Sequence, residues 1–282
     1  MKIAVATLCE LDDKDLKNSP YLRVLNEKSY LRILAERMAS LPIPCVPVCG
    51  VSRKNGNQIV RRELEHTPTV CFEGHEDRHR RLLEAAIHLR CDTIIYIPIG
   101  YTAFDIELTL HLIKVFEKNG FHMAHSTRYP PGLVPKIIRR NAFKRLLESG
   151  CPWPFYLHAE KFGLKSHDLP VPRRYKYDFS LVAEVEESWE LLEVLLRERP
   201  HRDLPDVLKH LWNVRDRTRR LREELDGWSR DQYADDFESR RKAHRERWEN
   251  WHIHMGVKRG ELAVPPGRIC VAGCNFGGVE WI

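Results

Sequence analysis

Short apolar runs alternate with amphipathic stretches through the first 200 residues of the chain. Compact apolar runs predict buried strands over residues 3–8, 45–49, 69–72 and 94–99. Between these runs, apolar side chains recur every three or four positions, which predicts helices over residues 30–38, 80–90 and 104–118. Asn119-Gly120 supplies a stop signal for the last helix. This order of elements predicts a layered α/β fold with a mostly parallel sheet.

The pattern changes near residue 200. Pro200 and Pro205 interrupt the chain, and residues 201–250 then carry 13 Lys or Arg beside 12 Asp or Glu. An apolar stripe at helical spacing runs through this charged stretch. We therefore expect an α/β domain over residues 1–200 and a charged, mainly helical C-terminal extension over residues 201–282. The interleaved acids argue against the alternative, a basic arm for nucleic acid.

Composition limits the class of protein. Of the 282 residues, 43% are hydrophobic and 30% are charged, which excludes a wholly disordered chain. The formal net charge of +6 is modest, so it permits a small anionic substrate and indicates no dedicated nucleic-acid surface. Apolar positions in the extension are compatible with a homodimer.

The sequence also predicts a location. It contains no apolar run near the length of a spanning helix, and the N-terminus lacks the pattern of a signal peptide, so we expect no membrane partner. The eight scattered cysteines favour reduced thiols in a cytoplasmic protein. Cys270 and Cys274, with His252 and His254 upstream, leave a zinc site open as an alternative to inert thiols.

Familiar phosphate-binding motifs are missing: there is no P-loop, and no G-x-G-x-x-G follows the first strand. Instead, a polar loop over residues 9–23 follows that strand. Later segments of interest read Gly-Tyr-Thr-Ala-Phe-Asp over residues 100–105, Tyr-Pro-Pro-Gly-Leu-Val-Pro-Lys over 129–136 and Val-Ala-Glu-Val-Glu-Glu-Ser over 182–188.

In this order and spacing, the segments resemble the cytidylyltransferase family of polysaccharide biosynthesis, whose members are related to the synthetases of CMP-sialic acid and CMP-Kdo. The resemblance covers roughly 200 of the 282 residues. It implies a three-layer α/β/α sandwich of the nucleotide-diphospho-sugar transferase type. Asp77 and Arg81 match a family pair four residues apart on a helix, for which an ion pair is the natural interpretation.

The resemblance implies a phosphate site in the loop after the first strand. Lys14, Lys17, Ser19 and Arg23 fall where the family holds the phosphates of CTP, and Arg23 stands at the position of a phosphate-binding lysine. Arginine offers a fixed bidentate fork where lysine offers a compact ammonium, so it suits phosphate with altered geometry. Solvated cations are the alternative interpretation.

The resemblance also implies Mg²⁺. In the family, a D-x-P-L-x-D segment and a later T-V-D-T-P-E-D segment supply carboxylates to the metal. Here Gly100 replaces the leading aspartate of the first segment, Asp105 keeps the trailing one, and Glu184 keeps a carboxylate in the second. We therefore expect Asp105 and Glu184 near the metal, with Arg23 and Asp105 as the catalytic pair, because Mg²⁺ neutralises the charge that develops in nucleotidyl transfer.

On the acceptor side, the family's Y-P-D-G-L-D-V-E segment has lost its acids in this chain. Lys136 now ends it and Arg128 precedes it, which implies that these two cations bind a carboxylate or phosphate of the acceptor. Solvated cations at the start of an element are again the alternative.

The function expected from these observations is transfer of a cytidylyl group from CTP, or another nucleotide, to a sugar-like or anionic acceptor, with release of pyrophosphate. The first alternative is a glycosyltransferase that uses a sugar nucleotide. The only D-x-D triplet, Asp13-Lys14-Asp15, lies in the loop after the first strand and not after a central one. The second alternative is a non-catalytic member of the same fold that binds a nucleotide or a protein partner.

Overall fold

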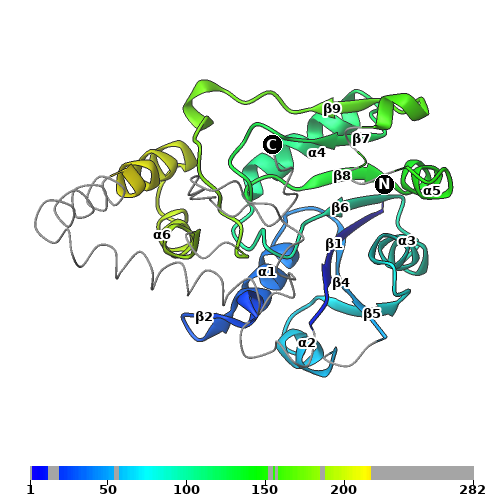
Figure 1. Cartoon of the computed structure of the whole chain (residues 1–282), viewed down its shortest axis with the longest axis horizontal. Coiled ribbons are helices and arrows are strands. Elements are labelled where there is room, and N and C mark those ends of the chain that lie inside the picture. Colours follow the sequence, from blue (N-terminus) through cyan, green and yellow to red (C-terminus); the bar gives the residue numbers. More distant parts are fainter. Residues whose placement is uncertain are drawn as a thin grey trace, which may run out of the picture. The chain divides into compact units, whose positions relative to one another are not determined.

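A seven-stranded sheet forms the centre of the first part of the chain, with strand order β5-β4-β1-β6-β8-β7-β9 (Figure 1). The computed structural model describes residues 2–11, 19–53, 57–151, 155, 158–184 and 188–216. The strands of this sheet are β1 (Ile3–Cys9), β4 (Cys45–Ser52), β5 (Val70–Gly74), β6 (Thr93–Tyr96), β7 (Met123–His125), β8 (Lys136–Arg139) and β9 (Ser166–Asp168). Only β8 runs antiparallel to its neighbours β6 and β7, so the expectation of a mostly parallel sheet is confirmed.

Helices cover both faces of the sheet. They are α1 (Tyr30–Ala39), α2 (Asn57–Leu64), α3 (Arg78–His88), α4 (Ile106–Lys118), α5 (Arg140–Glu148) and α6 (Trp189–Glu198). In Figure 1, α3 and α5 lie to the right of the sheet and α1 lies to its left. This arrangement is the three-layer α/β/α sandwich that the sequence predicts.

The alternation of side chains along β1 explains why both faces are covered. Ala4, Ala6 and Leu8 pack into an apolar cluster with residues of α3 and α5. Cys9 packs with residues of α1 and α2 on the opposite face. Every residue of β1 is buried, as expected for a central strand of a parallel sheet.

Side chains at helix starts fix where the predicted helices begin. Ser29, Asp77 and Asp105 occupy the N-cap positions of α1, α3 and α4, and each side chain accepts a hydrogen bond from a backbone N–H in the first turn. At the other end of α4, Asn119 is the C-cap and Gly120 takes the left-handed conformation, as the stop signal predicts.

Smaller elements were not foreseen in the sequence pattern. They are the 3₁₀ helices η2 (Pro20–Leu22), η4 (Ala159–Phe162) and η5 (Arg173–Tyr175), and the two-residue strands β2 (Val24–Leu25) and β3 (Lys28–Ser29). Strands β7 and β9 have only three residues each, too few for a periodic pattern to register.

The chain divides into two compact units, Met1–Leu208 and Lys209–Ile282. Helical structure begins again at residue 204 and continues to 216, the last residue described. The rest of the expected extension, with Cys270 and Cys274, lies outside the described residues. Within the described ranges, no helix combines the length and the apolar character needed to cross a lipid bilayer.

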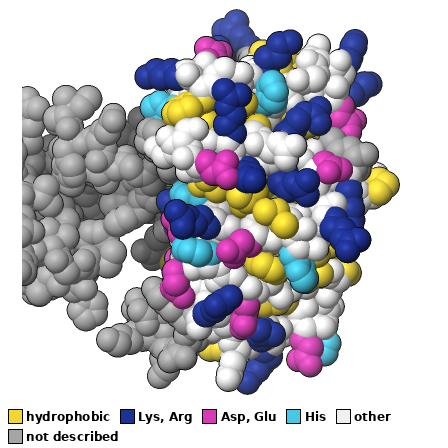
Figure 2. Space-filling model, turned by 90° about the vertical axis from the view of Figure 1, so that its right-hand side faces the viewer, with side chains coloured by type: hydrophobic (Ala, Val, Ile, Leu, Met, Phe, Trp, Pro, Cys, Tyr) yellow, Lys and Arg dark blue, Asp and Glu magenta, His cyan; other side chains and the backbone are white. Residues whose placement is uncertain are grey.

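Figure 2 shows the side of the molecule that carries α3 and α5. Lys and Arg side chains are interspersed there with acidic ones, and a short band of apolar side chains crosses the centre. Ile87 of α3 is the most exposed large apolar residue on these two helices, at 51%. This face presents no area of a single charge.

Candidate functional site

The carboxyl ends of the parallel strands identify one edge of the sheet as the place for a ligand. From β1 the chain steps outward to β4 and β5, and it then returns to the other side of β1 to form β6. In open α/β sheets, ligands bind outside the carboxyl ends of the strands at the point where the strand order reverses. Here that point lies between β1 and β6, so it is bordered by the loop after Cys9 and the segment that leads to Gly100.

Glu184 reaches this edge from a distant part of the sequence. The Tyr21 hydroxyl donates a hydrogen bond to Glu184 Oε1 at 2.9 Å, and the backbone N–H of Ala183 donates to the Gly100 carbonyl at 2.8 Å. The other carboxylate oxygen, Oε2, is buried and has no hydrogen-bond partner among the described residues. The structure thus brings the loop after β1, the segment after β6 and Glu184 together.

Burial governs the protonation of the groups around Glu184. It raises the pKa of the Glu184 carboxyl, and hydrogen bonds from its own backbone and from Tyr21 offset part of that rise. Burial, followed by the nearby Glu184 charge, raises the pKa of the Tyr21 hydroxyl. Burial also raises the pKa of Tyr96, at the end of β6, to about 12. Both tyrosines therefore keep their protons at neutral pH.

Asp105 lies in a different environment, at the start of α4. Its Oδ1 accepts the backbone N–H of Leu108 at 2.9 Å, and its Oδ2 accepts from Arg199 Nε at 2.9 Å. Arg199 also donates to Glu107 at 2.6 Å. Only 3% of the Asp105 surface is exposed. Asp105 and Glu184 therefore have separate partners. Asp105 caps α4 and forms an ion pair with Arg199.

Arg23 is held against α6. Its guanidinium lies 4.1 Å from the centre of the Trp189 ring and forms a 3.4 Å ion pair with Glu193. The Arg23 carbonyl accepts the backbone N–H of Tyr30 at 2.9 Å, which ties the end of the loop to the start of α1. These contacts attach the loop after β1 to two helices.

The remaining residues expected at the phosphate loop are only partly described. The carbonyl of Ser19 accepts the N–H of Leu22 at 3.1 Å, whereas the buried Ser19 hydroxyl has no partner among the described residues. Lys14 and Lys17 lie outside the described residues.

The acceptor-side cations lie at the same edge of the sheet, on β8 and after β7. Lys136 opens β8 opposite Tyr96, and burial lowers the pKa of its ammonium to about 8. Arg128 is exposed, and its Nε lies 4.0 Å from Asp168 Oδ2. His125 is buried, and burial lowers its pKa to about 4 despite the opposing influence of Asp168. The pattern of acids lost between residues 129 and 136 did not point to His125.

A buried arginine stabilises the neighbouring strand ends. Arg81 is fully buried, forms an ion pair with Glu10 after β1, and donates to the His75 carbonyl at 2.8 Å. The expected helical ion pair is thus replaced: Asp77 caps α3, and Arg81 pairs with a residue far away in sequence. A Cβ on Gly74 would lie 2.9 Å from Arg81 Cγ, so glycine leaves space for this side chain.

The arrangement fits a cation held by few protein ligands. Among the described residues, no three His, Cys, Asp or Glu side chains gather as metal ligands. Mg²⁺ commonly takes one or two carboxylates and completes its shell with substrate phosphates and water. The buried, unpartnered Oε2 of Glu184 fits such a single carboxylate ligand.

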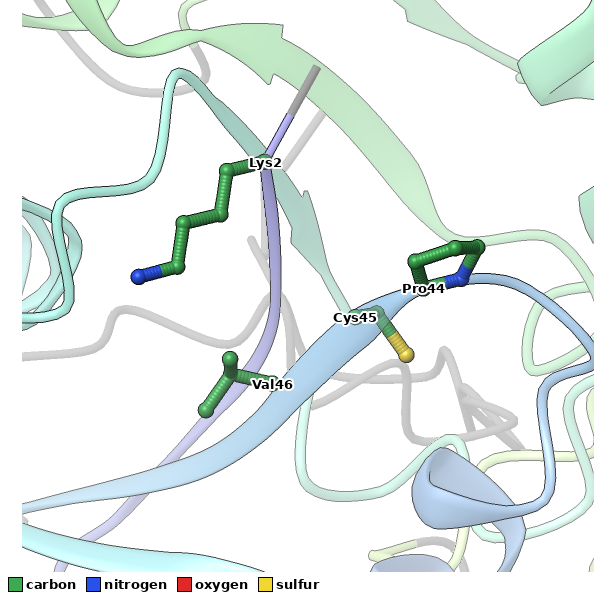
Figure 3. A pocket seen from close by; sticks show the side chains of 4 residues that line it. All are labelled: Lys2, Pro44, Cys45 and Val46. Atoms are coloured by element: carbon green, nitrogen blue, oxygen red, sulfur yellow. The ribbon is translucent and has the colours of Figure 1, made fainter.

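A shallow surface depression lies at the opposite edge of the sheet. Lys2, Pro44, Cys45 and Val46 line it, at the amino ends of β1 and β4 (Figure 3), and its volume is about 510 Å³. None of the candidate site residues contributes to this lining.

No protein-family model and no curated protein matches this sequence. Solved structures do match it. A cytidylyltransferase from Leptospira borgpetersenii serovar Hardjo-bovis aligns with a TM-score of 0.61 at 15% identity, over 76% of this chain and 94% of that one. A CMP:2-keto-3-deoxy-manno-octonic acid synthetase, in a structure with CTP, aligns with a TM-score of 0.52 at 12% identity, over 71% and 100% of the two chains.

A third solved structure belongs to 4-diphosphocytidyl-2C-methyl-D-erythritol synthase from Anaerococcus prevotii DSM 20548. It aligns with a TM-score of 0.51 at 12% identity, over 69% of this chain and 96% of that one. At these identities the matches show the fold alone, which this chain shares with the three solved structures. The fold expected from the sequence is confirmed.

Proposed function

We propose that the protein is a nucleotidyltransferase that moves a cytidylyl group from CTP to a sugar-like or anionic acceptor and releases pyrophosphate. The observation that carries the proposal is the Glu184 carboxylate against Gly100, with one unpartnered oxygen, at the edge where the strand order reverses. Similarity to three cytidylyltransferase structures, one of them with CTP, supports the choice of nucleotide.

The reaction needs positioning and charge neutralisation more than covalent chemistry. The hydroxyl oxygen of the acceptor attacks the α-phosphorus of CTP and loses its proton to solvent. The bond from that phosphorus to the bridging oxygen breaks, and pyrophosphate leaves with the electron pair. Mg²⁺, when bound, neutralises the phosphate oxygens, and Glu184 is the residue of this chain that would hold it. Lys14 and Lys17, in the loop after β1, supply further positive charge to the phosphates.

Lys136 and Arg128 give the acceptor side a positive character. Lys136 is partly buried beside Tyr96, whereas Arg128 is exposed at the rim of the same edge. Positive charges gathered at one edge attract a ligand that brings a negative charge. We infer that the acceptor carries a carboxylate or a phosphate.

The alternatives have less support. None of the three matched structures is described as a glycosyltransferase, so they do not support glycosyl transfer from a sugar nucleotide. Nucleotide binding without turnover would give the same fold and the same carboxylate, so the experiment must separate binding from chemistry.

The test is a calorimetric titration of the full chain with CTP, ATP, GTP and UTP, with and without Mg²⁺, followed by a pyrophosphate-release assay with acidic and neutral sugars. We expect CTP to bind most tightly and Mg²⁺ to strengthen that binding. We also expect the protein to release pyrophosphate from CTP when an acidic sugar is present as the acceptor. Glu184→Gln should lose the effect of Mg²⁺, whereas Glu148→Gln, on the exposed end of α5, should keep it. Absence of nucleotide binding would overturn the proposal, and CTP binding without pyrophosphate release would favour the non-catalytic alternative.

A further inference from the structure

Gly100 is a glycine for reasons of space. The described glycines with positive φ are Gly120, Gly132, Gly150 and Gly163, so the backbone of Gly100 does not itself demand glycine. A Cβ built on Gly100 would lie 1.5 Å from Glu184 Oε2 and 2.4 Å from its Cδ, and all three nearest atoms belong to Glu184. The Glu184 carboxylate therefore occupies the space that any side chain at position 100 would need.

The carboxylate is held in this space from two directions. The Ala183 N–H bonds to the Gly100 carbonyl at 2.8 Å, and the Ala183 carbonyl accepts from Trp189 Nε1 at 2.7 Å, so the backbone before Glu184 is fixed. At the other end of the side chain, the Tyr21 hydroxyl binds Oε1 at 2.9 Å. Oε2 is left without a partner among the described residues and lies over the Gly100 backbone.

We propose that Gly100 and Glu184 form a compensating pair, in which Glu184 supplies from the opposite segment the carboxylate that a side chain at position 100 would otherwise provide, and that Tyr21 is the residue that positions it. The role of the carboxylate toward a divalent cation rests on the proposed function. The steric exchange between positions 100 and 184 does not depend on it.

The pair links the two positions sterically. A side chain at position 100 would overlap the Glu184 carboxylate where it now lies, so a substitution there has to displace that carboxylate. Tyr21 is suited to hold Glu184 because its hydroxyl donates and its ring belongs to the loop that closes the same edge. Loss of that hydroxyl should release the carboxylate without removing it.

The first experiment uses Mn²⁺ as the probe cation, with free Mn²⁺ measured by electron paramagnetic resonance in the presence of CTP. We expect Gly100→Ala and Glu184→Ala each to weaken Mn²⁺ binding about tenfold, as losses of metal ligands or of their supports typically do. The exchange variant Gly100→Asp with Glu184→Ala returns a carboxylate from the other side, and it should bind within about threefold of the natural protein. An exchange variant that binds no better than Glu184→Ala alone would overturn the proposal.

Tyr21 is tested as a positioning residue by separating two affinities. Tyr21→Phe keeps the ring but removes the hydroxyl, so Mn²⁺ binding should weaken by roughly three- to tenfold while CTP binding without the cation stays unchanged. Tyr175→Phe is the matched control, because the Tyr175 ring packs on Tyr129. Equal effects of the two variants, or a parallel loss of cation-free CTP binding in Tyr21→Phe, would overturn the role of Tyr21.

Thermal unfolding without any ligand tests the steric pair by itself. Gly100→Ala should lower the melting temperature by roughly 2–4 °C because the displaced carboxylate loses its hydrogen bond, and it should have no such effect when Glu184 is already alanine. Additive shifts would overturn the pair, whatever the cation assays show. Non-additive shifts in a protein that binds neither CTP nor Mn²⁺ would retain the pair and overturn the proposed function.

Discussion

Asp105 and Glu184 are two carboxylates that the same family resemblance marks, and the structure surrounds them differently: Asp105 is buried, and Glu184 is partly buried. Both oxygens of Asp105 accept hydrogen bonds, from a backbone N–H and from Arg199. In Glu184, Oε1 accepts a hydrogen bond from Tyr21, and Oε2 has no partner among the described residues. A fully bonded buried carboxylate stabilises the fold, whereas one with an open oxygen costs stability and is available to a ligand.

The difference predicts opposite consequences for removing the two groups. Asp105 caps α4 and neutralises Arg199, which is only 19% exposed on its side chain. Burial raises the pKa of Glu184, so the folded protein disfavours its charged form. The stability of the fold should therefore depend on Asp105, and ligand binding should depend on Glu184.

The largest effect is expected for Asp105→Ala. It removes an N-cap and leaves Arg199 without its buried partner, which together should lower the free energy of unfolding by about 3 kcal/mol. Calorimetry should show a melting temperature lower by roughly 6–12 °C. Glu107→Ala is the matched control, because Glu107 pairs with the same Arg199 but is 78% exposed. A stable Asp105→Ala variant that has lost cation binding would return Asp105 to the metal site.

A smaller loss is expected for Arg199→Gln. Asp105 keeps its cap hydrogen bond but its Oδ2 is left buried without a cation, which should cost about 2 kcal/mol. In the double variant with Asp105→Ala the two losses should not add, because they remove the same ion pair. Arg202→Gln serves as the control, since Arg202, at 42% side-chain exposure, pairs with Glu198, the last residue of α6. Additive losses measured by urea unfolding would contradict this coupling.

Glu184→Gln should raise the free energy of unfolding, whereas the two substitutions above lower it. Because the pKa of Glu184 is raised in the folded state, ionisation in that state is penalised once the pH exceeds the raised pKa, and the penalty disappears below the pKa of the unfolded chain. The variant should therefore be more stable than the natural protein near pH 8, and the difference should shrink towards pH 4. Melting curves across this range are the measurement, with Glu148→Gln as the exposed control. A variant that is less stable near pH 8 would show that Glu184 is as well satisfied as Asp105.

Sequence patterns predicted the parts of the fold that rest on local periodicity. The strand at β1 and the helices α1, α3 and α4 were predicted within two residues of their observed starts, because each buries a continuous face. Strands β7 and β9 were not, since three residues carry no period and their pairing is decided by β8 and by each other.

The candidate site could be predicted only as residue types. Motif order marked Asp105 and Glu184 alike, because the spacing of acids in a sequence does not reveal what each carboxylate contacts. The partners that separate them, Arg199 and Tyr21, lie 94 and 163 residues away. The same holds for Arg81, whose partner Glu10 is 71 residues away. Gly100 was visible in the sequence at a position where the resembled family has aspartate, but its contact with Glu184 is a tertiary one that the sequence does not show.

Arg23 is a third charged residue that the family resemblance marks. Its guanidinium was expected to bind phosphate, and in the structure it lies against α6. Its ion pair with Glu193 is exposed by 40% and 35% on the two side chains, and such pairs contribute roughly 0.2–1 kcal/mol. Its contact with the Trp189 ring adds about 0.5–1 kcal/mol. Arg23 thus resembles Asp105 in having protein partners, but its partners Trp189 and Glu193 are only partly buried.

Arg23→Ala should consequently cost less stability than Asp105→Ala or Arg199→Gln. We expect the free energy of unfolding to fall by about 1 kcal/mol and the affinity for CTP to fall by no more than about threefold. The reason is that the Arg23 guanidinium contacts α6, so the substitution removes only the contacts that attach the loop to this helix. Glu193→Ala is the matched variant: it frees Arg23 without removing its charge, and it should leave CTP affinity unchanged. A loss of CTP affinity of tenfold or more in Arg23→Ala, with tighter binding in Glu193→Ala, would show that Arg23 leaves α6 for the phosphates. That result would place Arg23 with Glu184 among the ligand-binding groups and leave Asp105 alone as the structural one.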